Sequence, residues 1–120
     1  MLKKIVYLAA AVAILTTTQG VAVGDDTGFA SIHTLRKERG KLCMADHFHS
    51  GEGQGRTKRR AKRAAAIDWG GFTGFEYGTD WARFSRAGSR TSKCGRVSGG
   101  WSCQVEARPC RRLVRRAKKK

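Results

Sequence analysis

Four cysteines constrain this chain most, and three of them lie in one stretch of 17 residues, from Cys94 to Cys110. Inside that stretch, Ser98-Gly99-Gly100 is a typical turn sequence. Apolar and polar residues then alternate from Trp101 to Arg108, which is the period of a half-buried strand. Pro109 has no N–H to donate, so the strand ends there or lies at a sheet edge. The stretch therefore predicts a β-hairpin.

The register of this hairpin indicates how the cysteines pair. With a turn centred on Ser98-Gly99, Cys94 lies opposite Cys103. A disulfide can join two facing residues that form a non-hydrogen-bonded pair of the antiparallel ladder, because the Cα atoms of such a pair lie about 4.5 Å apart. That pairing leaves Cys43 for Cys110. Four cysteines allow three connectivities, and we favour Cys94–Cys103 with Cys43–Cys110.

The first 24 residues have the pattern of a secretory signal peptide. Two lysines precede an uncharged apolar run from Ile5 to Leu15, and small residues follow up to a predicted cleavage after Gly24; Gly20 and Ala22 are alternatives. A membrane anchor is the other interpretation, but a bilayer span needs roughly 20 residues. We expect export to the periplasm or the extracellular space, no transmembrane segment after cleavage, and two disulfides.

Cleavage would leave 96 residues with a net charge of +14, because residues 1–24 hold two lysines and no acid. Such a small domain often needs covalent cross-links. Residues 25–40 show little periodicity and are predicted to be a disordered lead-in. The folded domain is predicted over residues 41–111, with a disordered basic tail over 112–120. Within the domain, Ser50 to Gly55 is predicted to be a flexible glycine-rich loop.

A helix is predicted from Lys58 to Tyr77, with Thr57 as its N-cap and Gly78 as its end. Its expected buried stripe consists of Ala61, Ala64, Ala65, Trp69, Phe72 and Phe75. The first hairpin strand is predicted to begin near Trp81, with a bulge near Gly88. The expected fold is α+β: one helix packed on a disulfide-stapled antiparallel two-stranded sheet.

Several motifs between Leu42 and Arg111 stand in a distinctive order. They are Cys43-Met-Ala-Asp-His-Phe-His, Ala64-Ala-Ala-Ile, Trp69, Phe72-Thr, Glu76-Tyr-Gly, Trp81-Ala, Cys94, Trp101-Ser-Cys and Ala107-Arg-Pro-Cys. This order resembles a group of small exported bacterial proteins of unknown function. The resemblance implies a Gram-negative exporter and a helix followed by two antiparallel strands. It implies no activity and no functional residues. The three glycines of the predicted helix depart from the motif and leave the helix length open.

The most concentrated charge is a run of six cations in eight positions. They are Arg56, Lys58, Arg59, Arg60, Lys62 and Arg63. Such a surface attracts polyanions in a salt-dependent way, and the polyanions near an exported bacterial protein are anionic lipid, lipopolysaccharide and wall polymers. A solvated face that keeps the protein soluble is the alternative, and a membrane-active amphipathic peptide is another.

Sequence-specific binding of nucleic acid is not expected, because base stacking needs exposed aromatic side chains among the cations. The aromatic residues stand beside the basic run and are predicted to form the core. They are Trp69, Phe72, Phe75, Trp81 and Phe84.

Asp46, His47 and His49 are candidate ligands for zinc or copper. In an extended segment the two histidines would point the same way, because side chains alternate between faces. A surface His-x-His, or two packed and hydrogen-bonded rings, is the alternative interpretation.

Glu76 and Asp80 could act as paired carboxylates, but a helix end or ion pairs with arginines explain them more simply. Oxidised cysteines cannot serve as nucleophiles. We therefore expect no enzyme and no cofactor. The predicted function is electrostatic association of a small exported cationic protein with anionic envelope surfaces or other polyanions. Metal binding through Asp46, His47 and His49 is the alternative.

Overall fold

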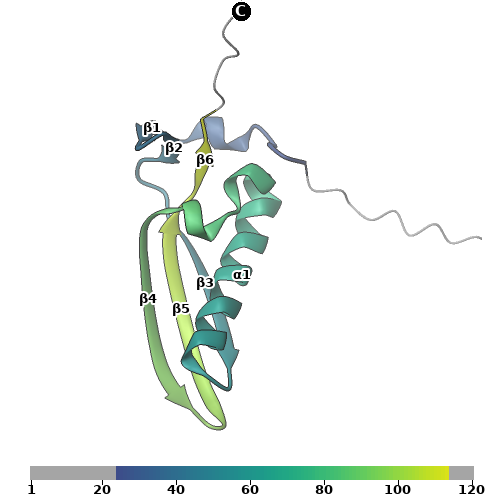
Figure 1. The fold of residues 1–120 in the computed structure, drawn as a ribbon. Helices are drawn as coiled ribbons and strands as arrows, with labels where there is room; N and C mark the ends of the chain where they lie inside the picture. Colours follow the sequence, from purple (N-terminus) through teal and green to yellow (C-terminus); the bar gives the residue numbers. More distant parts are fainter. Residues whose placement is uncertain (1–23, 114–120) are drawn as a thin grey trace, which may run out of the picture.

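The computed structural model describes residues 24–113. The predicted signal peptide, apart from Gly24, and most of the predicted basic tail lie outside these residues. The described chain contains one long helix and two three-stranded antiparallel sheets (Figure 1). The elements are β1 (Leu35–Glu38), β2 (Lys41–Met44), β3 (His49–Gly55), α1 (Lys58–Tyr77), β4 (Gly88–Val97), β5 (Gly100–Arg108) and β6 (Cys110–Arg112), with a short 3₁₀ turn η1 (Phe29–Ile32) before β1.

The larger sheet has the order β3-β5-β4, and α1 lies along one of its faces (Figure 1). The smaller sheet has the order β1-β2-β6. The α+β class and the disulfide staples are thus confirmed, but the prediction of a single two-stranded sheet is wrong. Four strands were not predicted: β1, β2, β3 and β6. Two of them, β1 and β3, lie in segments that the sequence predicted to be irregular, 25–40 and 50–55.

Residues 25–40 are not a disordered lead-in, because they contain η1 and the edge strand β1. β1 pairs with β2 through a two-residue turn in which Arg39 and Gly40 have φ angles of 45° and 77°. The strand has only four residues and little apolar alternation, so it carries almost no local sequence pattern. Pairing with β2 is what orders it.

The glycine-rich stretch Ser50 to Gly55 is a strand and not a flexible loop. Gly51, Gly53 and Gly55 share the face of β3 that packs against α1, because side chains two residues apart lie on the same side of a strand. A Cβ added at Gly55 would lie only 2.8 Å from the backbone nitrogen of Ala61, and one at Gly53 would overlap the backbone of Ala65. The glycines therefore let the helix approach the sheet closely.

The predicted bounds of the helix are confirmed. Thr57 accepts a hydrogen bond from the backbone N–H of Arg60 (3.2 Å), and Gly78 follows the last helical residue with φ 104°. The predicted stripe, however, is only partly right. Ala61, Ala65 and Trp69 are buried, whereas Phe72 and Phe75 are 55% and 75% exposed.

The buried line of α1 follows every fourth residue. It consists of Ala61, Ala65, Trp69, Thr73 and Tyr77. Each step of four residues advances about 40° around the helix, so this line winds around α1 and does not follow a stripe parallel to the helix axis. Two core clusters result: Trp69 packs over the β3-β5-β4 sheet, and Tyr77 packs with Ala30, Met44 and Trp81 at the other sheet.

The hairpin is confirmed in its turn, its register and its bulge. Cys94 faces Cys103, Val97 faces Gly100, and the pairing of β4 with β5 shifts between Gly88 and Thr91. Its first strand, however, begins at Gly88 and not near Trp81. Residues 79–86 form two 3₁₀ turns instead, which carry Trp81 into the core.

The disulfide pairing is the one that the sequence favours. Cys94 is joined to Cys103, and Cys43 is joined to Cys110. The first bridge lies inside the larger sheet, and the second joins β2 to β6 in the smaller one. No helix in residues 24–113 is long and apolar enough to cross a membrane.

Candidate metal centre

All three histidines of the chain meet near the C-terminal end of α1. His47 lies two residues before His49, the first residue of β3, and His33 follows η1. The His33 and His47 rings stack with centroids 4.3 Å apart. Because α1 runs antiparallel beside β3, its last turns reach the start of that strand and bring Thr73, Glu76 and Tyr77 to the same place. These three contribute the remaining polar groups of the cluster.

Three atoms of this cluster have the spacing of metal ligands. His49 Nε2 lies 3.0 Å from His47 Nε2 and 3.2 Å from Glu76 Oε2. Ligand atoms bound at about 2.0–2.1 Å to a tetrahedral zinc ion lie about 3.3 Å from one another. One ion could therefore contact all three atoms with small side-chain movements.

Hydrogen bonds and ring stacking with residues of α1 hold the histidine side chains in place. His49 Nδ1 lies 2.9 Å from the hydroxyl of Thr73, which is fully buried. Metal-bound histidines usually hydrogen-bond through the ring nitrogen that does not face the metal, which fixes the tautomer and the ring orientation. Tyr77 OH lies 2.8 Å from His33 Nε2, and the His49 ring stacks on that of Tyr77 with centroids 5.2 Å apart.

The electrostatics favour neutral imidazoles. Burial lowers the pKa of His49, and the nearby His47 and His33 rings lower it further, against an opposing effect of Glu76. Burial also lowers the pKa of His47, with His33 adding to the effect. Burial and Glu76 raise the pKa of Tyr77, so its hydroxyl keeps its proton. At neutral pH both histidines can thus offer a nitrogen lone pair to a cation.

The structure brings together two of the three candidate ligands that the sequence predicts and places a different carboxylate beside them. His47 and His49 do point the same way. Asp46 is exposed and lies outside the group of converging ligand atoms, where Glu76 takes its place. Glu76 thus contacts a histidine and not an arginine. The sequence could not show this, because Glu76 meets His49 only through the packing of α1 on β3.

A second group of ligand types, Glu38 with Cys43 and Cys110, lies in the smaller sheet. Its two sulfur atoms are joined in a disulfide. Thiolate is the form of cysteine that binds a metal, so this group offers no such ligand in the oxidised protein.

The six predicted polyanion-binding cations lie at the start of α1 or just before it, at the opposite end of the helix from the histidines (Figure 1). All six are exposed: Arg56, Lys58, Arg59, Arg60, Lys62 and Arg63. Trp101 lies beside Lys58, one of the six, and beside Arg96, a contact that the local sequence pattern did not indicate. Lys58 Nζ and the guanidinium of Arg96 lie 5.7 and 5.0 Å from its ring centroid.

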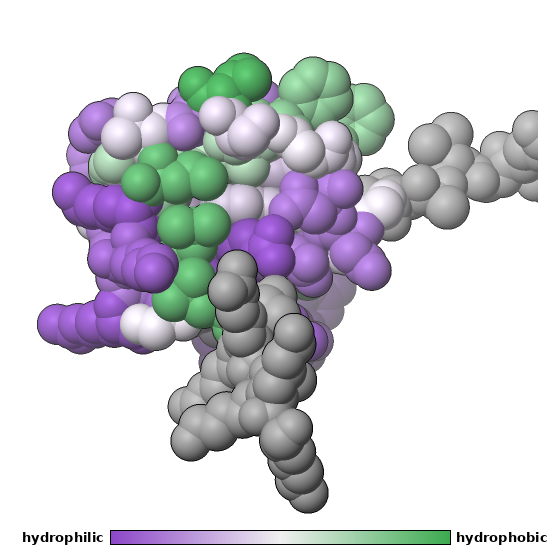
Figure 2. Space-filling model, turned by 90° about the horizontal axis from the view of Figure 1, so that it is seen from above, coloured by the Kyte–Doolittle hydropathy of each residue, from purple (hydrophilic) through white to green (hydrophobic). Residues whose placement is uncertain are grey.

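The end of the molecule that holds the histidines also exposes large apolar side chains. Seen from above, hydrophobic side chains lie at the surface among hydrophilic ones (Figure 2). Phe29 and Ile32 of η1 are 61% and 75% exposed, and Phe72 contacts the His49 ring at a centroid distance of 4.7 Å. The candidate metal centre is therefore bordered by exposed aromatic surface.

Comparisons with known protein families, with characterised proteins and with solved structures give no match to this chain. The resemblance to small exported bacterial proteins stays a prediction. The function must therefore be argued from the site.

Proposed function

We propose that this protein binds a transition-metal ion, zinc or copper, through His47, His49 and Glu76. The observation that supports the proposal best is the convergence of one ligand atom from each residue, all within 4.8 Å of one another. Two imidazoles and one carboxylate are a donor set that suits both metals. Three protein ligands leave a fourth position on a tetrahedral ion for water or for a group from a partner.

The metal proposal is tested by titrating the folded full-length chain with zinc and with copper(II) in a calorimeter. We expect one ion per chain. Glu76→Gln removes a ligand charge and should weaken binding about 10- to 100-fold, and His47→Ala should do the same or more. Asp46→Asn is the matched control, because it makes the same chemical change on a carboxylate outside the cluster, and it should alter affinity less than about twofold.

Two results would contradict the metal site. One is a folded wild-type protein that takes up neither metal at micromolar concentrations. The other is equal weakening by Glu76→Gln and Asp46→Asn, which would show that the carboxylates act only through general charge.

A second candidate function is electrostatic association with polyanions such as anionic lipid or lipopolysaccharide. Within residues 24–113, none of the six cations at the start of α1 takes part in an ion pair, so their charge is available to a partner. We expect retention on heparin that weakens linearly with the logarithm of salt concentration. Retention should survive replacement of both His47 and His49 by alanine and should fall in Arg59→Gln/Arg63→Gln.

Two features support a proposed setting for this function outside the cytoplasm. All four cysteines are paired, which is typical of proteins that fold in oxidising compartments. The predicted signal peptide agrees with that setting. We therefore propose an exported, non-enzymatic metal-binding protein with a cationic end.

A further inference from the structure

A concave site lies at the junction of the two sheets, away from the histidines. Its cavity measures about 660 Å³, within the range of small-molecule sites. The β1–β2 hairpin forms one wall through Arg39 and Lys41. The start of β4 and the end of β5 form the other, through Ser89, Arg90 and Arg108.

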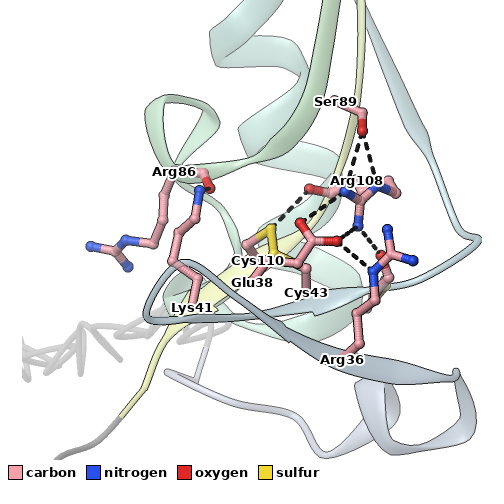
Figure 3. Close-up of polar contacts among 9 residues, drawn as sticks. Arg36, Glu38, Lys41, Cys43, Arg86, Ser89, Arg108 and Cys110 are labelled. Atoms are coloured by element: carbon pink, nitrogen blue, oxygen red, sulfur yellow. Dashed lines mark hydrogen bonds and ion pairs between the residues drawn. A yellow bond between two sulfur atoms is a disulfide. The ribbon is translucent and has the colours of Figure 1, made fainter.

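The single carboxylate in this cavity is already neutralised. Glu38 Oε1 lies 2.6 Å from Arg36 Nε and 2.8 Å from Arg108 Nη1, and its Oε2 accepts a hydrogen bond from Arg108 Nη2 at 2.9 Å (Figure 3). The other cations of the lining, Arg39, Lys41 and Arg90, have no carboxylate partner among the described ion pairs. The cavity therefore presents uncompensated positive charge.

The walls of this cavity are held by specific contacts. Lys41 Nζ donates to the backbone carbonyl of Arg86 at 2.7 Å (Figure 3), which fixes the ammonium group and leaves two of its N–H groups free to donate. At the bulge of β4, Ser89 has a φ angle of 49°, and its hydroxyl accepts hydrogen bonds from the Arg108 guanidinium at 3.2 and 3.3 Å. Lys41 and Arg108 are thus held in place by contacts within the protein.

Further positive charge surrounds the cavity. Burial lowers the pKa of Arg86, and the nearby Arg112 and Arg83 lower it further, against an opposing effect of Asp80. Arg112 lies directly opposite Lys41 in the pairing of β6 with β2. The lining residues of the cavity thus carry a net positive charge, with the neutralised Glu38 as their one carboxylate.

We propose that this cavity binds a phosphate group carried by a small molecule or by a lipid headgroup, with Arg39, Lys41 and Arg90 as its direct partners. Guanidinium groups form paired hydrogen bonds with phosphate oxygens, and a lysine ammonium adds a point charge. The Arg108–Glu38 pair serves as the rigid floor and does not bind the ligand. The proposal is independent of the metal centre.

The test is calorimetric titration of the folded full-length chain with inorganic pyrophosphate at constant ionic strength. We expect one saturable site. Arg39→Gln/Arg90→Gln should weaken binding at least 10-fold. The matched control is Arg59→Gln/Arg63→Gln, which removes the same charge from α1 and should change affinity less than about twofold. Glycerol 3-phosphate and dihexanoyl phosphatidic acid then separate the sources, since tighter binding of the second identifies a lipid headgroup.

Nuclear magnetic resonance on the wild-type chain gives a second reading that needs no variant. Pyrophosphate should shift the amide signals of Gly40, Ser89 and Arg90 more than those of Arg59 and Arg63. Equal weakening by the two double variants, binding of several ions without saturation, or larger shifts along α1 would each overturn the proposal. The first two results would not count against the metal proposal, which rests on other residues.

Discussion

At the scale of single residues, Arg108 joins the two sheets. Its side chain lies at the end of β5 and is 5% exposed. It donates to the backbone carbonyl of Met44 at 2.7 Å, to the carboxylate of Glu38 and to the hydroxyl of Ser89 (Figure 3). Gly88 makes this arrangement possible, because a Cβ there would lie 2.8 Å from the guanidinium. One residue thus satisfies groups from three strands.

Glu38 should make the stability of the fold depend on acid pH. Hydrogen bonds from Arg108, and secondarily Arg36, lower its pKa from 4.5 to about 2 despite some burial. A group whose pKa is lower in the folded state stabilises the fold above its unfolded pKa. This contribution should therefore be complete above about pH 4.5 and should disappear as the pH falls to about 2.

We predict that Glu38→Gln lowers the free energy of unfolding at pH 7 by about 3 kcal/mol, because it leaves the buried Arg108 without its counter-charge. Urea unfolding at several pH values measures this difference, which should shrink as the pH approaches 2. The exposed Glu106 offers a control, since Glu106→Gln should change stability by less than about 0.5 kcal/mol. A difference between the wild type and Glu38→Gln that stays constant down to pH 2 would show that charge is not the cause.

Thr73 should act as a positioning residue for the proposed metal centre. Thr73→Val keeps the shape of the buried side chain and removes the hydroxyl that holds His49 Nδ1. We expect zinc affinity to fall about 10- to 100-fold, as is usual for such outer partners, with one ion still bound per chain. Thr91→Val, on the exposed part of β4, should leave affinity unchanged. Unchanged affinity in Thr73→Val would mean that another contact orients the ring.

At the scale of elements, the packing of α1 on β3 depends on glycine. We predict that Gly53→Ala lowers the free energy of unfolding by about 3 kcal/mol, because the new Cβ overlaps the backbone of Ala65 and α1 must move away from the sheet. Urea unfolding and the heat of denaturation measure the loss.

Gly71→Ala is the counterpart within α1. A Cβ at Gly71 meets no atom within 4 Å, and alanine favours a helix by about 1 kcal/mol over glycine. This variant should therefore gain stability. If both alanine variants changed stability in the same direction, the glycines of β3 would not be explained by the close approach of α1.

At the scale of the whole molecule, the two disulfides close loops of very different length. The cysteines of Cys94–Cys103 are 9 residues apart within one hairpin, whereas those of Cys43–Cys110 are 67 apart and enclose α1 and all three strands of the larger sheet. In the chain-entropy description, a longer closed loop removes more freedom from the unfolded chain. The longer bridge should therefore stabilise the molecule more.

We predict losses of about 2.5 kcal/mol for Cys94→Ser/Cys103→Ser and about 4.5 kcal/mol for Cys43→Ser/Cys110→Ser. The free energies of unfolding of the two variants, measured in urea, give the comparison. The second variant should also loosen the smaller sheet, which hydrogen exchange of the β1 and β2 amides would detect. A larger loss for the hairpin bridge would show that local strain or packing, and not loop length, dominates.

Features that depend on neighbours along the chain could be predicted from the amino-acid sequence alone. The alternation after Trp101 and the Ser98-Gly99 turn specified the hairpin and the facing of Cys94 and Cys103. A cap at Thr57 and a glycine at position 78 set the ends of α1. These signals act over a few residues, so they can be recognised without knowing the rest of the fold.

How distant segments meet became visible only in the folded molecule. The period-two glycines of β3 indicate a strand only once a helix is known to lie against them. β1 forms because β2 is there to pair with it. Glu76 joins His47 and His49 because the buried line of α1 winds around the helix and carries its last turns to the start of β3. The physical reason is that these contacts depend on the angle and distance between elements, which backbone propensity does not encode.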